Sequence, residues 1–348
     1  MKLGRSIHDV ALEISRQKAA ATDYVCQSAG VDFNEVDGDV LVGAGGWNYP
    51  ATPLAHRQIG ERHKIPARHY DRLRQDYPDL LAETLNRIGQ KEPSRRLVRT
   101  LDGSVRAYLS DRYRTLDNWE VAEHALPAIQ EATSGTLEFA STEVTDTRLY
   151  LKALMPELQA EVRNVGDVVQ GGISITNSEC GLSALQARQL VLTLRCENGM
   201  VLPDSTYRRT HLGRELDDGQ QFHSVQTQRL TNSAVMAQLA DVIRGMLSEE
   251  RFTAAVNRLG DSTERHLTGR PQNAVEQVAQ RFDLNENESD GVLNHLIRGG
   301  DMTQYGLHAA VTRASQDVQD YDRASDLETM GGKIIELRSQ DWEVIATA

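Results

Sequence analysis

Cysteine is scarce in this sequence of 348 residues, which contains only Cys26, Cys180 and Cys196. An odd number of widely spaced cysteines without a CxxC pair argues against a disulfide framework and against a zinc site. No apolar run approaches the roughly 20 residues that span a bilayer. The N-terminal segment places charges among its hydrophobic positions, unlike a signal peptide. We therefore expect a cytoplasmic protein that does not associate with a membrane.

Positive charge is in deficit overall, since the formal net charge is −12, and this argues against a simple nucleic-acid-coating protein. The charge is unevenly distributed, however. Residues 51–115 contain fourteen Lys or Arg against eight Asp or Glu, whereas residues 283–343 contain five against thirteen. A basic first third and an acidic C-terminal region are typical of a body that binds a polyanion. The alternative is that both regions are solvated surfaces with a chance asymmetry.

Catalytic motifs are absent as well. The glycine-rich stretch 42–49 lacks the spacing of a phosphate-binding loop and indicates a tight turn. His56, His63 and His69 follow one another at intervals of seven and six, which is not the spacing of a helical metal site. No GxSxG motif occurs. We therefore expect no enzyme activity, no catalytic residue, no bound metal and no cofactor.

The hydrophobic patterns predict an α+β fold, with a central antiparallel β-sheet flanked by helices and a mostly helical C-terminal region. Residues 1–95 read as a helical region with a helix-turn-helix-like segment at 53–74. Residues 96–230 read as a β-rich core domain, and residues 231–348 as a helical, acidic region. Within the last region, the apolar residues of 333–347 predict a closing pair of strands.

A β-hairpin is expected at residues 96–116, because Asp102-Gly103 between two apolar runs is a strong turn signal. In the second run, Val105, Ala107 and Leu109 alternate with Arg106, Tyr108 and Ser110. This alternation predicts a half-buried strand whose polar face lines a groove.

Arginine beside an aromatic residue is the combination that binds single-stranded nucleic acid, since guanidinium groups bind phosphates and rings stack on bases. A second basic cluster follows at 207–214. The candidate nucleic-acid-binding residues are Arg99, Arg106, Tyr108, Arg112, Tyr113, Arg114, Arg208, Arg209 and Arg214. The alternative is a buried network, with Asp111 paired to an arginine and Tyr113 packed in the core.

Six segments taken in order carry a family resemblance. They are LVRTLDGSVRAYLSDRYRTLDN at 97–118, GDVVQGGISITNSECGLSAL at 166–185, LRCENGM at 194–200, RRTHLG at 208–213, TQYGLHAAVTRAS at 303–315 and LETMGGKIIEL at 327–337. With them the sequence resembles the phage/plasmid-like family known as domain of unknown function 932. The resemblance implies a protein of phages, plasmids or other mobile elements, placed in the cytoplasm of the host cell. It supplies no accepted catalytic residues.

Two functional hypotheses follow. The first is a single-stranded DNA-binding protein that acts in recombination or replication as a homo-oligomer, with strand annealing as a further expectation. The second is a non-enzymatic protein-interaction or counter-defence factor of a mobile element, which contacts a host protein through its acidic C-terminal region. An enzyme acting on nucleotides or nucleic acid is the least supported reading, because it needs converging carboxylates or a metal.

Overall fold

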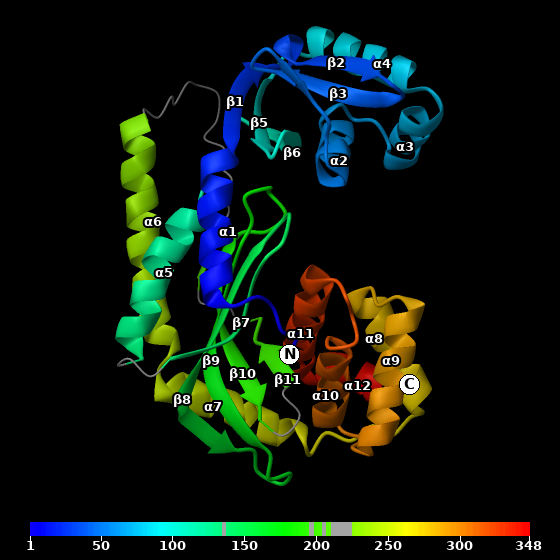
Figure 1. The fold of residues 1–348 in the computed structure, drawn as a ribbon. Helices are drawn as coiled ribbons and strands as arrows, with labels where there is room; N and C mark the ends of the chain where they lie inside the picture. The colour runs from blue at the N-terminus through cyan, green and yellow to red at the C-terminus, as the bar shows by residue number, and fades with distance from the viewer. Residues whose placement is uncertain (134–136, 195–197, 204–206, 210–224) are drawn as a thin grey trace.

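The computed structural model describes residues 1–133, 137–194, 198–203, 207–209 and 225–348 (Figure 1). The chain has the expected α+β fold, with antiparallel sheets and many helices. An N-terminal lobe, residues 22–110, lies at one end of the molecule, and a larger lobe is built around a central sheet. Within the described residues, no helix combines the length and apolar character that crossing a membrane requires.

The N-terminal lobe contains two small sheets and three helices. One sheet has the order β1-β5-β6 and the other β2-β3-β4. The helical expectation for residues 1–95 is therefore only partly met, because four short strands accompany the helices. The elements are β1 (Thr22–Gln27), η1 (Ser28–Gly30), β2 (Asp32–Val36), β3 (Asp39–Ala44), β4 (Trp47–Tyr49), α2 (Pro53–Arg62), α3 (Ala67–Asp76), α4 (Pro78–Lys91), β5 (Arg95–Leu101) and β6 (Ser104–Ser110).

Helix α2 begins at residue 53, the first residue of the predicted helix-turn-helix-like segment. The Thr52 side chain accepts a hydrogen bond from the Ala55 N–H, and Pro53 occupies the first turn. The helix packs its buried Ile59 into a core with Leu85 of α4 and Tyr108 of β6. Helix α2 thus covers one face of the β5–β6 hairpin.

The β5–β6 hairpin turns at Asp102 and Gly103, which both have positive φ angles, 51° and 74°. A turn of this kind matches the right-handed twist of the strands, so the predicted hairpin is confirmed. The pairing is irregular in its middle. Arg99 lies opposite Ala107 while the next residue, Thr100, lies opposite Val105, so Arg106 is an extra residue in β6. Such a β-bulge redirects a side chain.

The central sheet is antiparallel with the order β11-β10-β9-β8-β7, and the short β12 pairs with β10 at its edge. Its strands are β7 (Glu138–Val144), β8 (Leu149–Glu161), β9 (Val168–Asn177), β10 (Leu185–Thr193), β11 (Asn198–Val201) and β12 (Tyr207–Arg209). One face packs on α1 (Ile7–Ala20), α5 (Asn118–Ala132) and α6 (Val225–Met246). The apolar core between them is the largest in the molecule.

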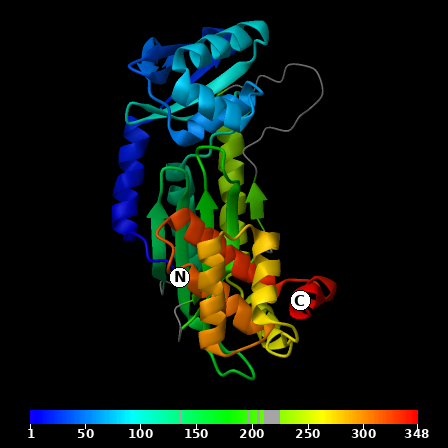
Figure 2. The ribbon, with the colours of Figure 1, turned by 90° about the vertical axis from the view of Figure 1, so that its right-hand side faces the viewer.

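The last third of the chain is helical, as expected. Its helices are α7 (Glu249–Ser262), α8 (Pro271–Phe282), α9 (Glu286–Gly299), α10 (Gln304–Ala314), α11 (Tyr321–Ile335) and α12 (Ser339–Ala346). Figure 2 shows the yellow-to-red helices lying against the sheet. The predicted strand pair at 333–347 is wrong. Ile334, Trp342 and Ile345 instead point from α11 and α12 into a core shared with the neighbouring helices.

Candidate functional site

Strand β6 is buried on both faces, so the expected exposed groove is not there. Tyr108 is fully buried, and its ring lies against Phe33 at 6.4 Å and His63 at 6.0 Å. Ala107 and Leu109 pack on the opposite face against Tyr113 and other apolar residues. The prediction that Tyr108 offers a stacking face is therefore wrong, because helices cover that face.

The same segment meets the buried-network alternative only in part, because Tyr113 is buried whereas Asp111 and its partner Arg95 lie at the surface. Tyr113 is largely buried, and its hydroxyl donates to the Ser178 carbonyl at 2.8 Å. Asp111 forms an ion pair with Arg95 at 3.6 Å. Tyr113 thus links β6 to the central-sheet lobe and does not face solvent.

Arg106 reaches the larger lobe because of the β-bulge. By strict alternation its side chain would point the same way as Tyr108, but the bulge places it on the face of Arg99 and Ala107. Its Nη1 lies 2.5 Å from Glu179 Oε2, and both side chains are buried. The alternation seen in the sequence therefore assigned Arg106 to the wrong face.

The N-terminal lobe meets the larger lobe at a group of charged side chains that we call the junction. Arg99 makes three side-chain hydrogen bonds there. Its Nε donates to Asp23 at 2.9 Å, its Nη2 to Asp117 at 2.7 Å and its Nη1 to the Glu179 carbonyl at 3.0 Å. Burial by itself lowers the pKa of the Arg99 guanidinium. The charges of Asp117 and Asp23 outweigh that effect and raise the pKa above its ordinary value. Arg99 therefore stays charged and joins strands β1 and β5 to the segment before α5.

Glu179 completes the junction from the turn after β9. Its Oε1 accepts a hydrogen bond from the Asn118 N–H at 2.5 Å, and its Oε2 pairs with Arg106. The turn comes close to β6, since a Cβ on Gly181 would lie 2.9 Å from a Leu109 methyl group, and Gly181 has a φ of 79°. Only glycine suits this position, where close approach and a left-handed backbone coincide.

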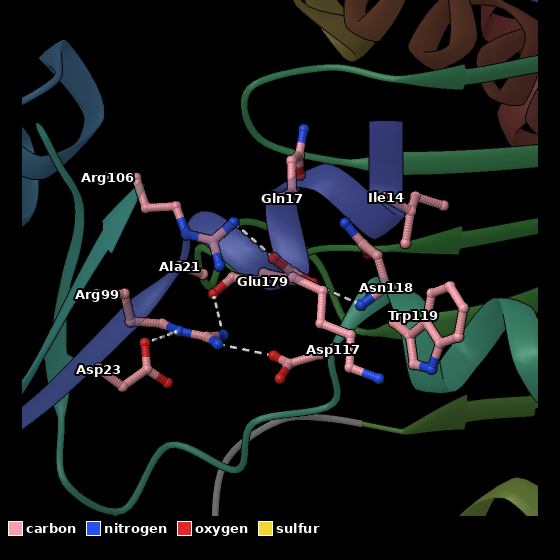
Figure 3. Close-up of a pocket in the computed structure, with 11 residues that line it drawn as sticks. Ile14, Gln17, Ala21, Asp23, Arg99, Arg106, Asp117, Asn118, Trp119 and Glu179 are labelled. Carbon is pink, nitrogen blue, oxygen red and sulfur yellow. Dashed lines mark hydrogen bonds and ion pairs between the residues drawn. The ribbon is translucent and has the colours of Figure 1, made fainter. Parts of the chain in front are cut away.

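These side chains enclose a cavity of about 200 Å³, which we call the junction cavity (Figure 3). Lys18 and Trp119 also line it, with the ammonium 4.3 Å from the centre of the indole ring. Three cationic side chains and three carboxylates face this space, so their formal charges cancel. They are Lys18, Arg99, Arg106, Asp23, Asp117 and Glu179.

Among the remaining predicted arginines, Arg208 and Arg209 lie on strand β12, and Arg114 lies close enough to Arg209 to feel its charge. Arg208 is exposed, and Arg114 and Arg209 are half-buried. We call these three residues the β12 arginine band. Arg112 is also exposed, just after β6. Burial and the charge of Arg209 lower the pKa of Arg114. Arg214 lies outside the described residues.

The pKa of Arg188 on the neighbouring strand β10 is lowered by the same two kinds of cause. Burial, followed by the charge of Arg208, lowers the pKa of Arg188, while Asp326 acts in the opposite direction. Arg208 lies opposite Gln186, and Arg209 opposite Leu185, in the β10–β12 pair. The two arginines of β12 therefore point to opposite faces of the sheet edge.

Sequence reasoning missed the acidic half of the junction: Asp23, Asp117 and Glu179. Arg99 finds Asp23 at a separation of 76 residues and the Glu179 carbonyl at 80. No local spacing connects such residues. The single local signal is Asp117, which precedes α5 and lies 18 residues from Arg99.

A second buried ion pair lies between the central sheet and α11. Lys152 Nζ is 2.6 Å from Glu328 Oε2, and both side chains are almost completely inaccessible. Lys152 also donates to Ser325, and Glu328 accepts from the Lys2 N–H. We call this group the sheet–helix pair. In the part of the chain that the structure describes, no group of three or more His, Cys, Asp or Glu side chains could hold a metal.

A family model described as domain of unknown function (DUF932) matches residues 106–341. The match includes Arg106, Asp117 and Glu179 of the junction cavity as well as strand β12. Asp23 and Arg99 lie before it. No curated protein and no solved structure matches the chain.

Proposed function

This chain belongs to the family described as domain of unknown function (DUF932), and, since that description assigns no activity, we propose from the geometry that it binds single-stranded nucleic acid along the β12 arginine band. The observation that carries this proposal is the crowding of like charges. Burial and then the charge of Arg209 lower the pKa of Arg114. Burial and then the charge of Arg208 lower the pKa of Arg188. Repulsion of this kind is relieved when a polyanion binds.

The geometry favours a single strand over a duplex. Arg208 and Arg209 project from opposite faces of a three-residue edge strand. A flexible single strand can pass around such an edge and meet both side chains. A duplex is stiff over about 150 base pairs, so it cannot bend around one strand. The net charge of −12 also restricts anion binding to local basic surfaces.

The test is a titration of a labelled oligonucleotide, single-stranded and duplex, followed by fluorescence anisotropy at several salt concentrations. We expect the single strand to bind more tightly and its affinity to fall steeply with salt. The double variant Arg208→Ala/Arg209→Ala should weaken binding about tenfold. Its salt slope should fall by about 1.4, since each lost single-strand phosphate contact removes about 0.7.

A matched control removes the same kind of charge elsewhere. Arg298 is exposed on α9 in the acidic C-terminal region, so Arg298→Ala should leave affinity and salt slope unchanged. Wild-type affinity in the β12 double variant would contradict the proposal. Absence of any oligonucleotide binding would favour the alternative, a protein-interaction factor that contacts a host protein through its acidic helices.

Strand annealing, a role in recombination or replication, and homo-oligomer formation extend this proposal. Annealing is measured by mixing two complementary labelled strands with the protein and following duplex formation. Light scattering on the eluting protein gives its mass with and without oligonucleotide. A monomer that binds but does not accelerate annealing would restrict the function to single-strand binding.

A further inference from the structure

The junction cavity contains a buried guanidinium with spare donors. Arg106 is only 7% exposed. The Arg106 side chain pairs with Glu179, and no other polar partner of its guanidinium is seen among the described residues. A guanidinium has five N–H donors, and the Arg106 Nε is buried without a hydrogen-bond partner among the residues that are described. A buried donor in this state, at the edge of a cavity, can pair with an acceptor atom of a ligand there.

The cavity does not select for net charge. Its three cationic and three anionic side chains balance, and Arg99 already has two carboxylates and a carbonyl as acceptors. An added anion would leave an uncompensated charge in a partly enclosed space. A neutral ligand with both acceptors and donors fits better, because Asp23 and Asp117 each use only one carboxylate oxygen on Arg99.

One wall of the cavity is flat and apolar. Trp119 and Ile14 lie beside the polar groups, as Figure 3 shows. The exposed Lys18 covers the indole ring. Contacts between a surface ammonium and a ring are weak, so a planar ligand can take its place on Trp119. The volume of about 200 Å³ corresponds to roughly seven water molecules of about 30 Å³ each, which admits one heterocycle.

We propose that the junction cavity binds one unpaired nucleobase, with guanine preferred. This proposal rests on the proposed function: one base of the bound single strand enters the junction cavity. A guanine offers a carbonyl oxygen to Arg106 and amino hydrogens to Asp117, while its ring lies on Trp119. Arginine pairs with the guanine carbonyl in known base recognition, and an aromatic ring stacks on any base.

The cavity lies close to the β12 arginine band along the chain. Arg114 of the band and Asp117 of the cavity are three residues apart, which is at most about 10 Å in an extended chain. A strand held at its phosphates by Arg114 can therefore turn one base toward Asp117. Adenine lacks the carbonyl group and thymine lacks the amino group, so both should bind less well.

The test uses free nucleosides and the fluorescence of Trp119. Guanosine should quench the emission in a saturable way, and adenosine and thymidine should do so at least tenfold more weakly. Inorganic phosphate should have no effect. The variant Trp119→Phe assigns the signal, since Trp47 and Trp342 remain in it.

Two variants test the cavity itself. Arg106→Lys keeps a positive charge beside Glu179 but removes donors, and it should weaken guanosine binding at least tenfold. Ala21→Phe fills the cavity from the end of α1, where Ala21 lines it, without removing a hydrogen bond, so it should abolish binding at unchanged thermal stability. Arg298→Lys is the matched control and should bind guanosine as the wild type does.

Guanosine binding that survives both variants, quenching by phosphate in place of guanosine, or no quenching by any nucleoside would each overturn this inference. A separate measurement distinguishes failure of the base pocket from failure of the proposed function. An oligonucleotide that binds equally well with bases and as an abasic sugar–phosphate chain would overturn the base pocket and leave strand binding at the β12 arginine band intact.

Discussion

Two buried ion pairs among the described residues differ in how completely their hydrogen bonds are satisfied. In the sheet–helix pair, Lys152 meets Glu328 and Ser325, and Glu328 also accepts from the Lys2 N–H. In the junction, the Arg106 guanidinium meets Glu179 alone among the described residues and lines a cavity. A saturated pair has a structural role, whereas a half-satisfied pair beside a cavity leaves room for a ligand.

The surroundings of the sheet–helix pair support this distinction. Tyr150 and Tyr321 pack together beside it, with ring centres 5.1 Å apart, and the Lys152 ammonium lies 4.9 Å from the Tyr321 ring. Burial lowers the pKa of Lys152, but the charge of Glu328 outweighs it and the net shift is upward. Lys152 therefore stays charged, and its contacts connect α11 to the central sheet.

The largest expected effect comes from breaking the sheet–helix pair. Glu328→Gln leaves the buried Lys152 charge uncompensated, which should lower the free energy of unfolding by about 3–5 kcal/mol. Urea denaturation measures it. The control is Asp326→Asn on the same helix, whose carboxylate is 47% exposed and pairs with Arg148, and its cost should stay below about 1 kcal/mol. Equal losses in the two variants would refute the contrast between buried and surface pairs.

The free energy of unfolding should also depend on pH, because a buried histidine lies among the C-terminal helices. His308 is buried on α10, and burial lowers its pKa to about 4. The unfolded chain takes up this proton below the ordinary pKa of about 6.5, while the folded chain does so only below about 4. The stability contributed by neutral His308 is therefore complete above about pH 6.5 and is lost progressively as the pH falls toward 4.

The expected loss from His308 is up to about 3 kcal/mol, at 1.36 kcal/mol per pKa unit. Urea denaturation at a series of pH values measures it. His308→Gln should flatten this part of the profile by that amount, while His124→Gln, a change on the exposed face of α5, should not alter it. An unchanged slope in His308→Gln would show that His308 is not the group responsible.

The smallest of the three effects concerns Arg99. Arg99→Lys keeps the charge but cannot reproduce three directed bonds to two carboxylates and a carbonyl. Because Asp23 and Asp117 are 32% and 45% exposed, water can replace the lost bonds, and the expected loss of unfolding free energy is about 2 kcal/mol. Thermal unfolding measures this change. A loss as large as that of Glu328→Gln would show that the junction is as sealed as the sheet–helix pair.

Local patterns were sufficient to predict several elements. Asp102-Gly103 between two apolar runs predicted the β5–β6 hairpin, and the helix-turn-helix-like segment was predicted to begin at residue 53, where α2 begins. The helical spacing of the last third was also read correctly, apart from α12 and the end of α11. These features depend on residues within a few positions of one another, so one sequence contains their signal.

The candidate site was less accessible to sequence reasoning. The sequence pattern predicted strand β6 at residues 105–110, but it did not predict the directions of the side chains on that strand. Tyr108 was expected at the surface and is fully buried, while Arg106 turns away from it. A prediction from alternation assumes that the strand pairs regularly and that only one of its faces is covered. Strand β6 contains a bulge, and both of its faces are buried.

The sequence alone determined the α+β composition and the β5–β6 hairpin, because each depends on local pattern or composition. Only the tertiary structure decided which arginines are buried and what they meet. The β-bulge at Arg106 is a property of how β5 and β6 pair, and Arg99 and Glu179 meet across 80 residues. Pairing register and long loop closure depend on packing of the whole chain, so no local pattern encodes them.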